Sequence, residues 1–379
     1  MKQHRLYEID LFRFIAAIMV LLFHYSFRGY AADNMSVMPY PLLANLAKYG
    51  YLGVHLFFII SGFVILMTAS SGSPKRFVIS RVVRLYPAFW VCCTMTFLVT
   101  AVLGGMRYKV TLGQYLVNMT MLSGFVGVPS IEGTYWSLFV EIKFYLLVFL
   151  ALILGTIHRA EILLGLWLIA TLVLAKWHIS YVSYFLIPDY SPYFIVGAMF
   201  YIIHRNGISF FRILIVISSY VFATWKATTS EIYDMVSHYG MDFSLVVIIS
   251  ILSVFFSVFF LISTKRIGWF ATPRWLFLGA LTYPLYLVHE NVGFMIFNTL
   301  YPFINLHVVM WATVFIMLLF AYSVNRFVEQ KYSPRMKHVL EQYTALKQRK
   351  THERIEALYS VPLQVVEFLK SQIYYNKIK

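Results

Sequence analysis

Long apolar runs set the pattern of this chain. Near-spanning runs, each close to the length that crosses about 30 Å of hydrocarbon, recur at residues 8–27, 50–69, 84–104, 136–156, 161–177, 191–204, 209–226, 243–263, 275–297 and 307–326. Helices are expected there because a helix satisfies its own backbone hydrogen bonds in lipid. The pattern predicts an all-α polytopic bundle of about ten transmembrane helices. Nine or eleven spans stay open, because 191–204 is short and 114–127 fits a re-entrant or interfacial piece.

Composition narrows the class of protein. The chain has 379 residues, of which 60% are hydrophobic and 12% charged, and this excludes an ordinary soluble domain. The net charge of +15 would favour nucleic acid in a soluble protein, but here the cations cluster in short loops, so no nucleic-acid partner is expected. Cys92 and Cys93 are adjacent and imply no disulfide framework. The first run carries Arg13 and is too long for a cleavable signal peptide, so it is expected to remain as a span.

The basic residues predict an orientation. With the N-terminus in the cytoplasm, the inside loops hold most of the loop cations, namely Lys75, Arg76, Arg81, Arg84, Arg159, Arg205, Lys265, Arg266 and Arg274. Cytoplasmic loops carry such an excess of Lys and Arg. Both termini are therefore predicted to be cytoplasmic.

The composition changes after about residue 334. We expect a transmembrane domain over 1–334 and a basic, helical cytoplasmic tail over 335–379. Within the tail, Leu363, Val366, Leu369 and Ile373 recur at helical spacing, as in an interfacial amphipathic helix. A solvated tail is the equal alternative.

Arg13 and His24 form the most informative pair in the sequence. They lie eleven residues apart within the first apolar run, which is about 16 Å along a helix and about three turns, so both side chains point to one face. Ionisable side chains inside a membrane face the bundle interior or a wet cavity. His24 is the leading candidate for a general base, because imidazole titrates near neutrality. A structural histidine and a snorkelling arginine are the alternatives.

Three further segments carry candidate site residues. Arg81 and Arg84 lie three apart near Lys75 and Arg76, where paired guanidinium groups suit a nucleotide diphosphate, although topology alone also predicts such charges. The run at 136–156 begins with Trp136, Ser137, Glu141 and Tyr145. There Glu141 is expected to orient His24 or bind the acceptor, or else to form a salt bridge with Lys143 or Arg13.

The third segment, LTYPLYLVHENVGF, places Tyr283, Tyr286, His289 and Glu290 in one span. Tyr286 and His289 share a face there and fit an acceptor contact, a second acid or base, or a structural polar cluster. Phosphate-loop, nucleophile-elbow and metal-binding motifs are not found in the sequence. No metal site is therefore expected.

Together these motifs resemble the acyltransferase family 3 of integral membrane enzymes. The resemblance rests on IDLFRFIAAIMVLLFH, YGYLGVHLFFIISGFVI, FVISRVVRLYPAFW, GTYWSLFVEIKFY, YFIVGAMFY, LGALTYPLYLVH and RFVEQKYSP, in that order. It extends to about residue 334 and leaves the role of the tail open. The resemblance implies an acyl-CoA co-substrate and no permanently bound cofactor.

Carried over by position, the resemblance implies roles for several residues. It makes His24 the catalytic histidine, Arg13 its partner, and Arg81 and Arg84 the donor-binding arginines. We expect Arg13, Lys75 and Arg76 to assist them in binding the donor, with substrate contacts from Trp136, Ser137, Tyr145, Tyr286 and His289. Direct transfer and an acylated intermediate both remain open.

The predicted function is therefore that of a multi-pass bacterial inner-membrane O-acyltransferase. It would move an acyl group, expected to be acetyl, from cytoplasmic acyl-CoA to a hydroxyl of a cell-surface or lipid-linked carbohydrate, such as a lipopolysaccharide or exopolysaccharide. A transporter or exporter of a glycolipid, with the Arg, Glu and His residues as a substrate or proton path, is the main rival. A noncatalytic partner of a polysaccharide assembly complex is a third. The sequence does not indicate an oligomeric state.

Overall fold

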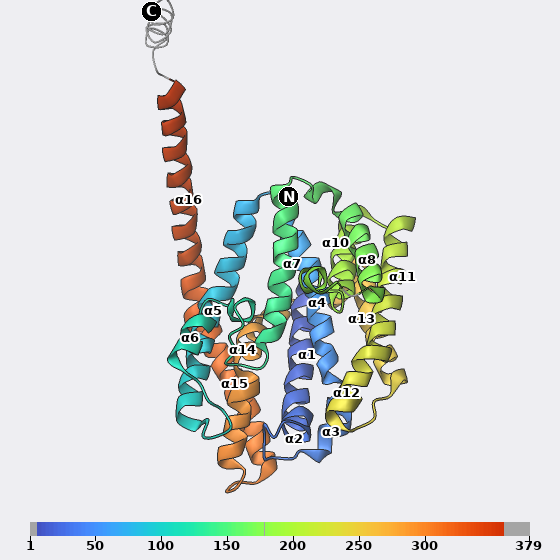
Figure 1. Cartoon of the computed structure of the whole chain (residues 1–379), viewed down its shortest axis with the longest axis vertical. Helices are drawn as coiled ribbons and strands as arrows, with labels where there is room; N and C mark the ends of the chain where they lie inside the picture. Colours follow the sequence, from blue (N-terminus) through green and yellow to red (C-terminus); the bar gives the residue numbers. More distant parts are fainter. Residues whose placement is uncertain (1–5, 178, 360–379) are drawn as a thin grey trace, which may run out of the picture.

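The computed structural model describes residues 6–177 and 179–359, which form helices and no strand. The long helices are α1 (Tyr7–Phe23), α4 (Gly53–Ala69), α5 (Pro74–Leu103), α7 (Tyr135–Ile153), α8 (Ala160–Lys176), α10 (Ser191–Asn206), α11 (Phe210–Lys226), α13 (Leu245–Ser263), α14 (Trp275–Leu300), α15 (Leu306–Val324) and α16 (Gln330–Tyr359). All of them except α16, which projects beyond the others, stand roughly side by side in a bundle (Figure 1). The predicted all-α polytopic fold is confirmed.

Shorter helices connect the long ones. The α-helical pieces are α2 (Gly29–Ala31), α3 (Pro41–Ala47), α6 (Leu112–Asn118), α9 (Ser180–Leu186) and α12 (Ile232–Tyr239). The 3-10 turns are η2 (Lys48–Leu52), η3 (Ser123–Phe125), η4 (Ile157–Arg159) and η6 (Gly268–Phe270). The π-helical segments are η1 (His24–Arg28), η5 (Ala227–Glu231) and η7 (Asn325–Glu329).

Each of the ten predicted runs corresponds to one long helix. Within the described residues, nine helical stretches are long and apolar enough to cross a membrane. The run at 275–297 corresponds to α14, which is not among the nine because Tyr286, His289 and Glu290 interrupt its apolar sequence. The short run at 191–204 lies in a longer broken stretch, Ser180–Asn206, in which α9 precedes α10. Helix α6, in the segment 114–127, is only about 10 Å long and does not cross.

The centre of the bundle depends on close helix contacts. A Cβ on Gly62 of α4 would lie 2.2 Å from the carbonyl oxygen of Phe194, and one on Gly197 of α10 would lie 2.0 Å from that of Ile59. Only glycine allows two backbones to approach this closely. Helix α1 packs on α14 in a similar way, where Gly279 faces the carboxyl group of Asp10.

The bundle has two ends, which we name by their helices. Helices α2, α3 and α12 lie at the α12 face, which is the lower end in Figure 1, and α16 projects from the opposite α16 face. Helix α16 continues α15 through η7 and has no break at the predicted domain boundary of 334/335. The predicted amphipathic residues 363–373 lie outside the described residues.

The three π-helical segments all lie at the end of a long helix, and all contribute to the lining of a cavity. Each follows a long helix directly: η1 follows α1, η5 follows α11, and η7 follows α15. A π-helical turn adds a residue to the helical ladder and often occurs at a functional site. Each one here carries a residue that lines a cavity, and these residues are His24, Glu231 and Glu329.

Candidate active site

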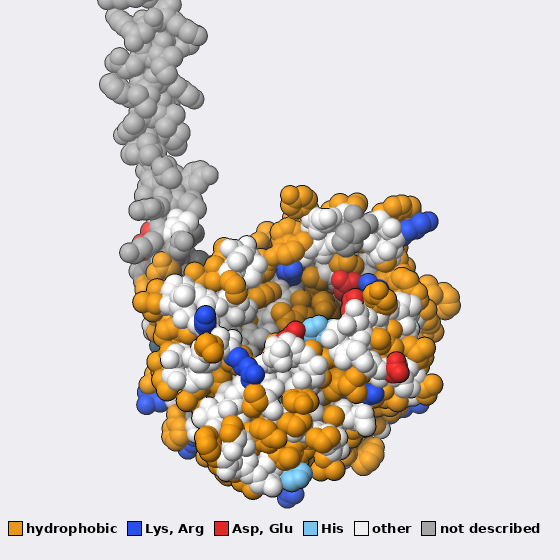
Figure 2. Space-filling view, turned by 60° about the horizontal axis from the view of Figure 1, so that its bottom comes forward, with side chains coloured by type: hydrophobic (Ala, Val, Ile, Leu, Met, Phe, Trp, Pro, Cys, Tyr) orange, Lys and Arg blue, Asp and Glu red, His pale blue; other side chains and the backbone are white. Residues whose placement is uncertain are grey.

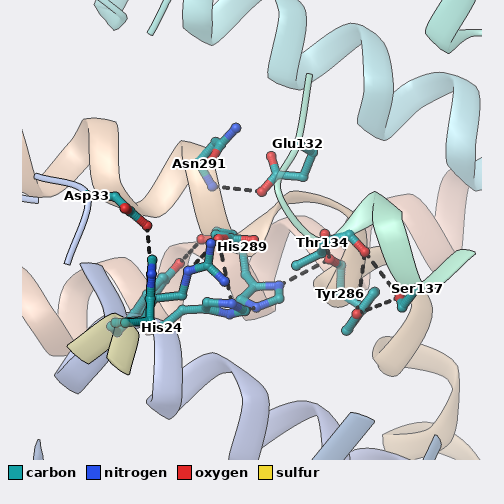
Figure 3. A network of polar contacts seen from close by, with 12 residues as sticks. His24, Asp33, Glu132, Thr134, Ser137, Tyr286, His289 and Asn291 are labelled. Atoms are coloured by element: carbon teal, nitrogen blue, oxygen red, sulfur yellow. Dashed lines mark hydrogen bonds and ion pairs between the residues drawn. The ribbon is translucent and has the colours of Figure 1, made fainter. Parts of the chain in front are cut away.

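His24 lies in a buried hydrogen-bonded pair with His289 (Figure 3). His289 Nδ1 is 3.1 Å from the carbonyl oxygen of Tyr286 and 3.2 Å from that of Leu285. Carbonyl oxygens only accept hydrogen bonds, so Nδ1 carries the proton and the Nε2 of neutral His289 is an acceptor. His24 Nδ1, 2.9 Å away, therefore donates to it. In this arrangement His24 Nε2 keeps its lone pair and is the basic nitrogen.

A carboxylate faces that basic nitrogen. Glu290 Oε1 lies 3.6 Å from His24 Nε2 and 3.4 Å from Arg28 Nε, and its side chain is 1% exposed. A proton taken up at His24 Nε2 would create an imidazolium beside this carboxylate, which would stabilise it. The arrangement can therefore accept a proton from a nearby hydroxyl and hold it.

Neighbouring residues hold the pair in place. The Tyr25 hydroxyl donates to the carbonyl oxygen of His289 over 2.7 Å. Glu132 accepts hydrogen bonds from the backbone N–H of Asn291 and from Thr96. Burial, and then the charge of Glu290, raise the pKa of the Glu132 carboxyl well above its usual range. A Cβ on Gly133 would lie 2.3 Å from Glu290, so only glycine leaves room for that carboxylate.

His24 lines the histidine cavity, which has a volume of about 280 Å³. Its lining includes His24, Arg28, Tyr51, His55, Trp136, Tyr190, Glu231 and Asp234. A second cavity of about 570 Å³ shares Arg28, Asp234 and Tyr239 with it and belongs to the α12 face. Figure 2 shows a hollow in this face with acidic and histidine side chains inside it.

The arginine cavity, of about 130 Å³, lies on the other side of Tyr286 and Val54, which line both cavities. It brings together seven of the predicted site residues, namely Arg13, Arg81, Arg84, Ser137, Glu141, Tyr145 and Tyr286. The Tyr286 hydroxyl is 2.7 Å from Ser137 Oγ. His24 and Arg13 thus lie in two adjacent cavities rather than in one.

The three arginines differ in their partners. Arg13 contacts Asp10 at 3.3 Å, and Arg84 contacts Glu329 at 2.7 Å. Arg81 donates to the hydroxyls of Ser80 and Thr68 and packs on the ring of Tyr145, and its Nε has no hydrogen-bond partner among the described residues. Among the described residues Arg81 has no carboxylate partner, unlike Arg13 and Arg84, so its charge is the one available to an anionic ligand.

A fourth cavity, of about 740 Å³, opens at the α16 face and shares Arg84 with the arginine cavity. Arg76 and Lys337 also line it, so the first turns of α16 form one wall. Lys75 lies beside Arg76 in the first turn of α5 and lines none of the four cavities described above. The cavities thus follow one another from the α16 face to the α12 face.

Glu141 and Glu290 belong to different parts of the site. Glu141 accepts a hydrogen bond from Ser61 at 2.5 Å, whereas Glu290 is the carboxylate beside His24. Lys143, which the sequence offered as a salt-bridge partner of Glu141, packs over the ring of Tyr184 instead. Trp136 lines the histidine cavity, away from the other residues of its segment.

Sequence reasoning assigned no role to several residues near His24. Glu290 follows His289 directly in an apolar run. Because a carboxylate inside a membrane costs free energy, its position there was the signal that could have indicated a functional role. Arg28 and Glu132 lie at the ends of apolar runs, where charges are common and carry little information. The pair of His55 and Glu231, 3.1 Å apart, joins segments far apart in the chain and leaves no local pattern.

Comparison with known proteins completes the description of the site. The sequence model of the acyltransferase 3 domain matches residues 6–326. Nodulation protein 10 of Rhizobium leguminosarum bv. viciae is 30% identical over 167 residues, which cover 38% of this chain and 44% of that protein. Putative acetyltransferase ORF330 of Acidianus two-tailed virus is 26% identical over 282 residues, covering 69% and 80% respectively.

No solved structure matches the chain. The family match spans α1 to η7 and includes the residues around His24 and the arginine cavity. From this match and the helical, membrane-type architecture, we conclude that the chain belongs to the acyltransferase 3 family.

Proposed function

We propose that this membrane acyltransferase is an O-acetyltransferase that uses acetyl-CoA and acetylates a hydroxyl of a cell-surface or lipid-linked carbohydrate. The observation that carries the proposal is the orientation of His24. Its basic Nε2 faces Glu290, and His24 lines a cavity that adjoins the arginine cavity through Tyr286 and Val54. A base between two cavities suits a reaction between two substrates that enter separately.

The reaction needs two proton transfers, one to His24 and one away from it. As the acceptor hydroxyl oxygen attacks the thioester carbonyl carbon, its proton passes to His24 Nε2. The carbon–sulfur bond then breaks, and the CoA sulfur leaves with that proton. The products are the O-acyl ester and free CoA, and His24 returns to its neutral form. Glu290 stabilises the imidazolium between the two steps.

Free arginine capacity supports an anionic donor at the α16 face. Arg81 lines the arginine cavity, and Arg76, Arg84 and Lys337 line the adjoining cavity of about 740 Å³. Guanidinium groups bind phosphate oxygens in pairs, as a nucleotide diphosphate requires. The basic loops of this face favour a cytoplasmic location in a bacterial inner membrane, where acyl-CoA is available.

The size of the arginine cavity supports a short acyl group. Its volume of about 130 Å³ is small beside ordinary ligand pockets, which are about 300–1,000 Å³. The name of the viral relative, a putative acetyltransferase, agrees with this choice. We therefore expect acetyl-CoA to be used faster than acyl-CoA with a long chain.

The test is transfer of radiolabelled acetyl from acetyl-CoA to bacterial glycolipids by the purified protein in detergent. We expect His24→Ala to lower the rate by about 10²- to 10⁴-fold, which is the usual contribution of a general base. His158→Ala is the matched control, because His158 is exposed and bonds only to the carbonyl oxygen of Gly155. A folded His24→Ala variant with undiminished transfer would contradict the assignment.

A further inference from the structure

We propose that the histidine cavity is the acceptor subsite and that it selects a sugar ring that bears no anionic group, either a neutral or an amino sugar. The inference rests on the proposed function and names the substrate class of that same site. It depends on the charge, the free hydrogen-bonding atoms and the aromatic rings of the cavity.

The charge of the lining is predominantly acidic. Glu231 and Asp234 line the cavity, and Glu290 lies beside it at His24. Arg28 is the cation of this lining, and Glu290 already faces it at 3.4 Å. His55 donates from Nε2 to Glu231, which needs no charge on the imidazole. A carboxylate or phosphate on the acceptor would therefore meet three carboxylates and a single guanidinium that already faces one of them.

Besides Nε of Arg28, two buried polar atoms of the lining have no hydrogen-bond partner among the described residues. They are the hydroxyl of Tyr51 and Nδ1 of His55, and their residues are 8% and 2% exposed. Because His55 Nε2 carries the proton toward Glu231, Nδ1 is an acceptor, whereas Tyr51 can donate. Buried polar groups are normally satisfied. A ligand with several hydroxyl groups would supply partners to both atoms.

Aromatic rings supply the apolar part of the subsite. Trp136 and Tyr190 lie with ring centroids 5.5 Å apart and their planes inclined by 42°, and both line the cavity. The C–H faces of a sugar ring pack on such aromatic surfaces, while its hydroxyls reach the polar groups around them. The combination of rings and carboxylates fits a saccharide better than a lipid chain or a nucleotide.

The size of the cavity sets how much of the acceptor it holds. About 280 Å³ is enough for a single sugar residue, being at the lower limit of ligand pockets. The adjoining cavity of about 570 Å³ at the α12 face would hold the next residues of the glycan. The modified hydroxyl would then lie at a terminal or side-branch sugar.

The experiment measures sugar binding to the purified full chain without any acyl donor, by tryptophan fluorescence at low salt. The probes are a methyl glucoside, glucosamine and glucuronate. We expect the first two sugars to bind and glucuronate to bind at least about tenfold more weakly, because like charges at a binding site repel. Equal binding of all three sugars by the wild type would overturn the proposal.

Variants locate the selectivity. Asp234→Asn and Glu231→Gln should each reduce the discrimination against glucuronate, whereas the matched control Asp242→Asn, an exposed residue outside the cavity lining, should not. Unchanged discrimination in both folded cavity variants would also overturn the proposal. Trp136→Leu should weaken binding of all sugars to a similar degree.

The outcome is separate from that of the proposed function. Acetyl transfer that depends on His24, together with no sugar selectivity, would leave the acetyltransferase intact and remove the acceptor assignment. If the sugars bind in the expected order but the protein transfers no acetyl group, the sugar subsite would stand and the acetyltransferase assignment would fall.

Discussion

The arginine cavity and the histidine cavity share a wall but differ in chemistry. Arg13, Arg81 and Arg84 line the first, whereas Glu231, Asp234 and His24 line the second. Tyr286 and Val54 belong to both linings. The difference shows that one protein interior can contain a mainly basic and a mainly acidic cavity separated by the width of a single side chain.

The wall between the cavities is itself held in place. The Tyr286 hydroxyl is bonded to Ser137, and the Tyr286 carbonyl oxygen accepts from both Thr134 and His289. The residue that separates the cavities therefore also fixes the tautomer of His289, and through it that of His24. Substrate separation and base orientation depend on the same short segment of α14.

The largest expected effect is a loss of acetyl transfer when the carboxylate beside His24 is displaced. Gly133→Ala would place a Cβ 2.3–2.6 Å from the Glu290 carboxylate, which must move away from His24. Acetyl transfer should fall about 10²-fold, as a displacement of about 1 Å can cause, while CoA binding stays unchanged. Gly113→Ala is the control, since its Cβ would meet open space. A loss of CoA affinity in Gly133→Ala would show that the two cavities are not independent.

The next largest expected effect is on CoA binding in the arginine cavity. Arg81→Ala should weaken CoA binding about tenfold or more, because a hydrogen bond to a charged group contributes about 1.5–3 kcal/mol, and sugar binding should not change. Equilibrium binding of CoA to the purified variant measures this. If affinity for CoA is the same as in the wild type, Arg81 serves only to retain a cytoplasmic loop.

Arg84 should behave differently from Arg81. Its partner Glu329 is 7% exposed and would lose its ion pair, so Arg84→Ala should lower the free energy of unfolding by about 1–3 kcal/mol. Asn325 still donates to the other oxygen of Glu329 and limits the loss. Thermal unfolding of Arg84→Ala beside Arg81→Ala tests the contrast, which would be absent if both variants unfolded at the wild-type temperature.

The smallest expected effect is a pH dependence of the folding stability that comes from Glu132, the neighbour of Glu290. Burial raises the pKa of Glu132 above its ordinary value of 4.5, so the folded chain retains a proton that the unfolded chain loses. Stability should therefore fall as the pH rises above about 4.5. Glu132→Gln, which has no proton to lose, should show a flatter profile in thermal unfolding from pH 5 to 8. An identical slope in both proteins would contradict this reasoning.

Much of the fold could be predicted from the sequence, because spanning helices must be long and apolar. Helix α14 shows the limit, since the residues that make it functional also reduce its hydropathy. The arginine cavity was accessible to sequence reasoning through Arg13, Arg81 and Arg84, which stand out in apolar surroundings. Glu290 was visible in the same way, but its proximity to His24 depends on the packing of α1 against α14.

Other features had no local signal. The three π-helical segments turn His24, Glu231 and Glu329 toward cavities, yet a single inserted residue does not alter the apolar pattern. The close approach of α4 and α10 likewise depends on which glycine faces which carbonyl. Such details follow from tertiary packing rather than from periodicity.

The glycine contacts between α4 and α10 also bear on how the protein works. With Gly62 against Phe194 and Gly197 against Ile59, no layer of side chains separates the two backbones, so the helices cannot slide past each other easily. Carriers rely on one half of the molecule rocking against the other. A centre packed in this way instead favours a stationary scaffold, in which small molecules move through the cavities and the helices stay in place.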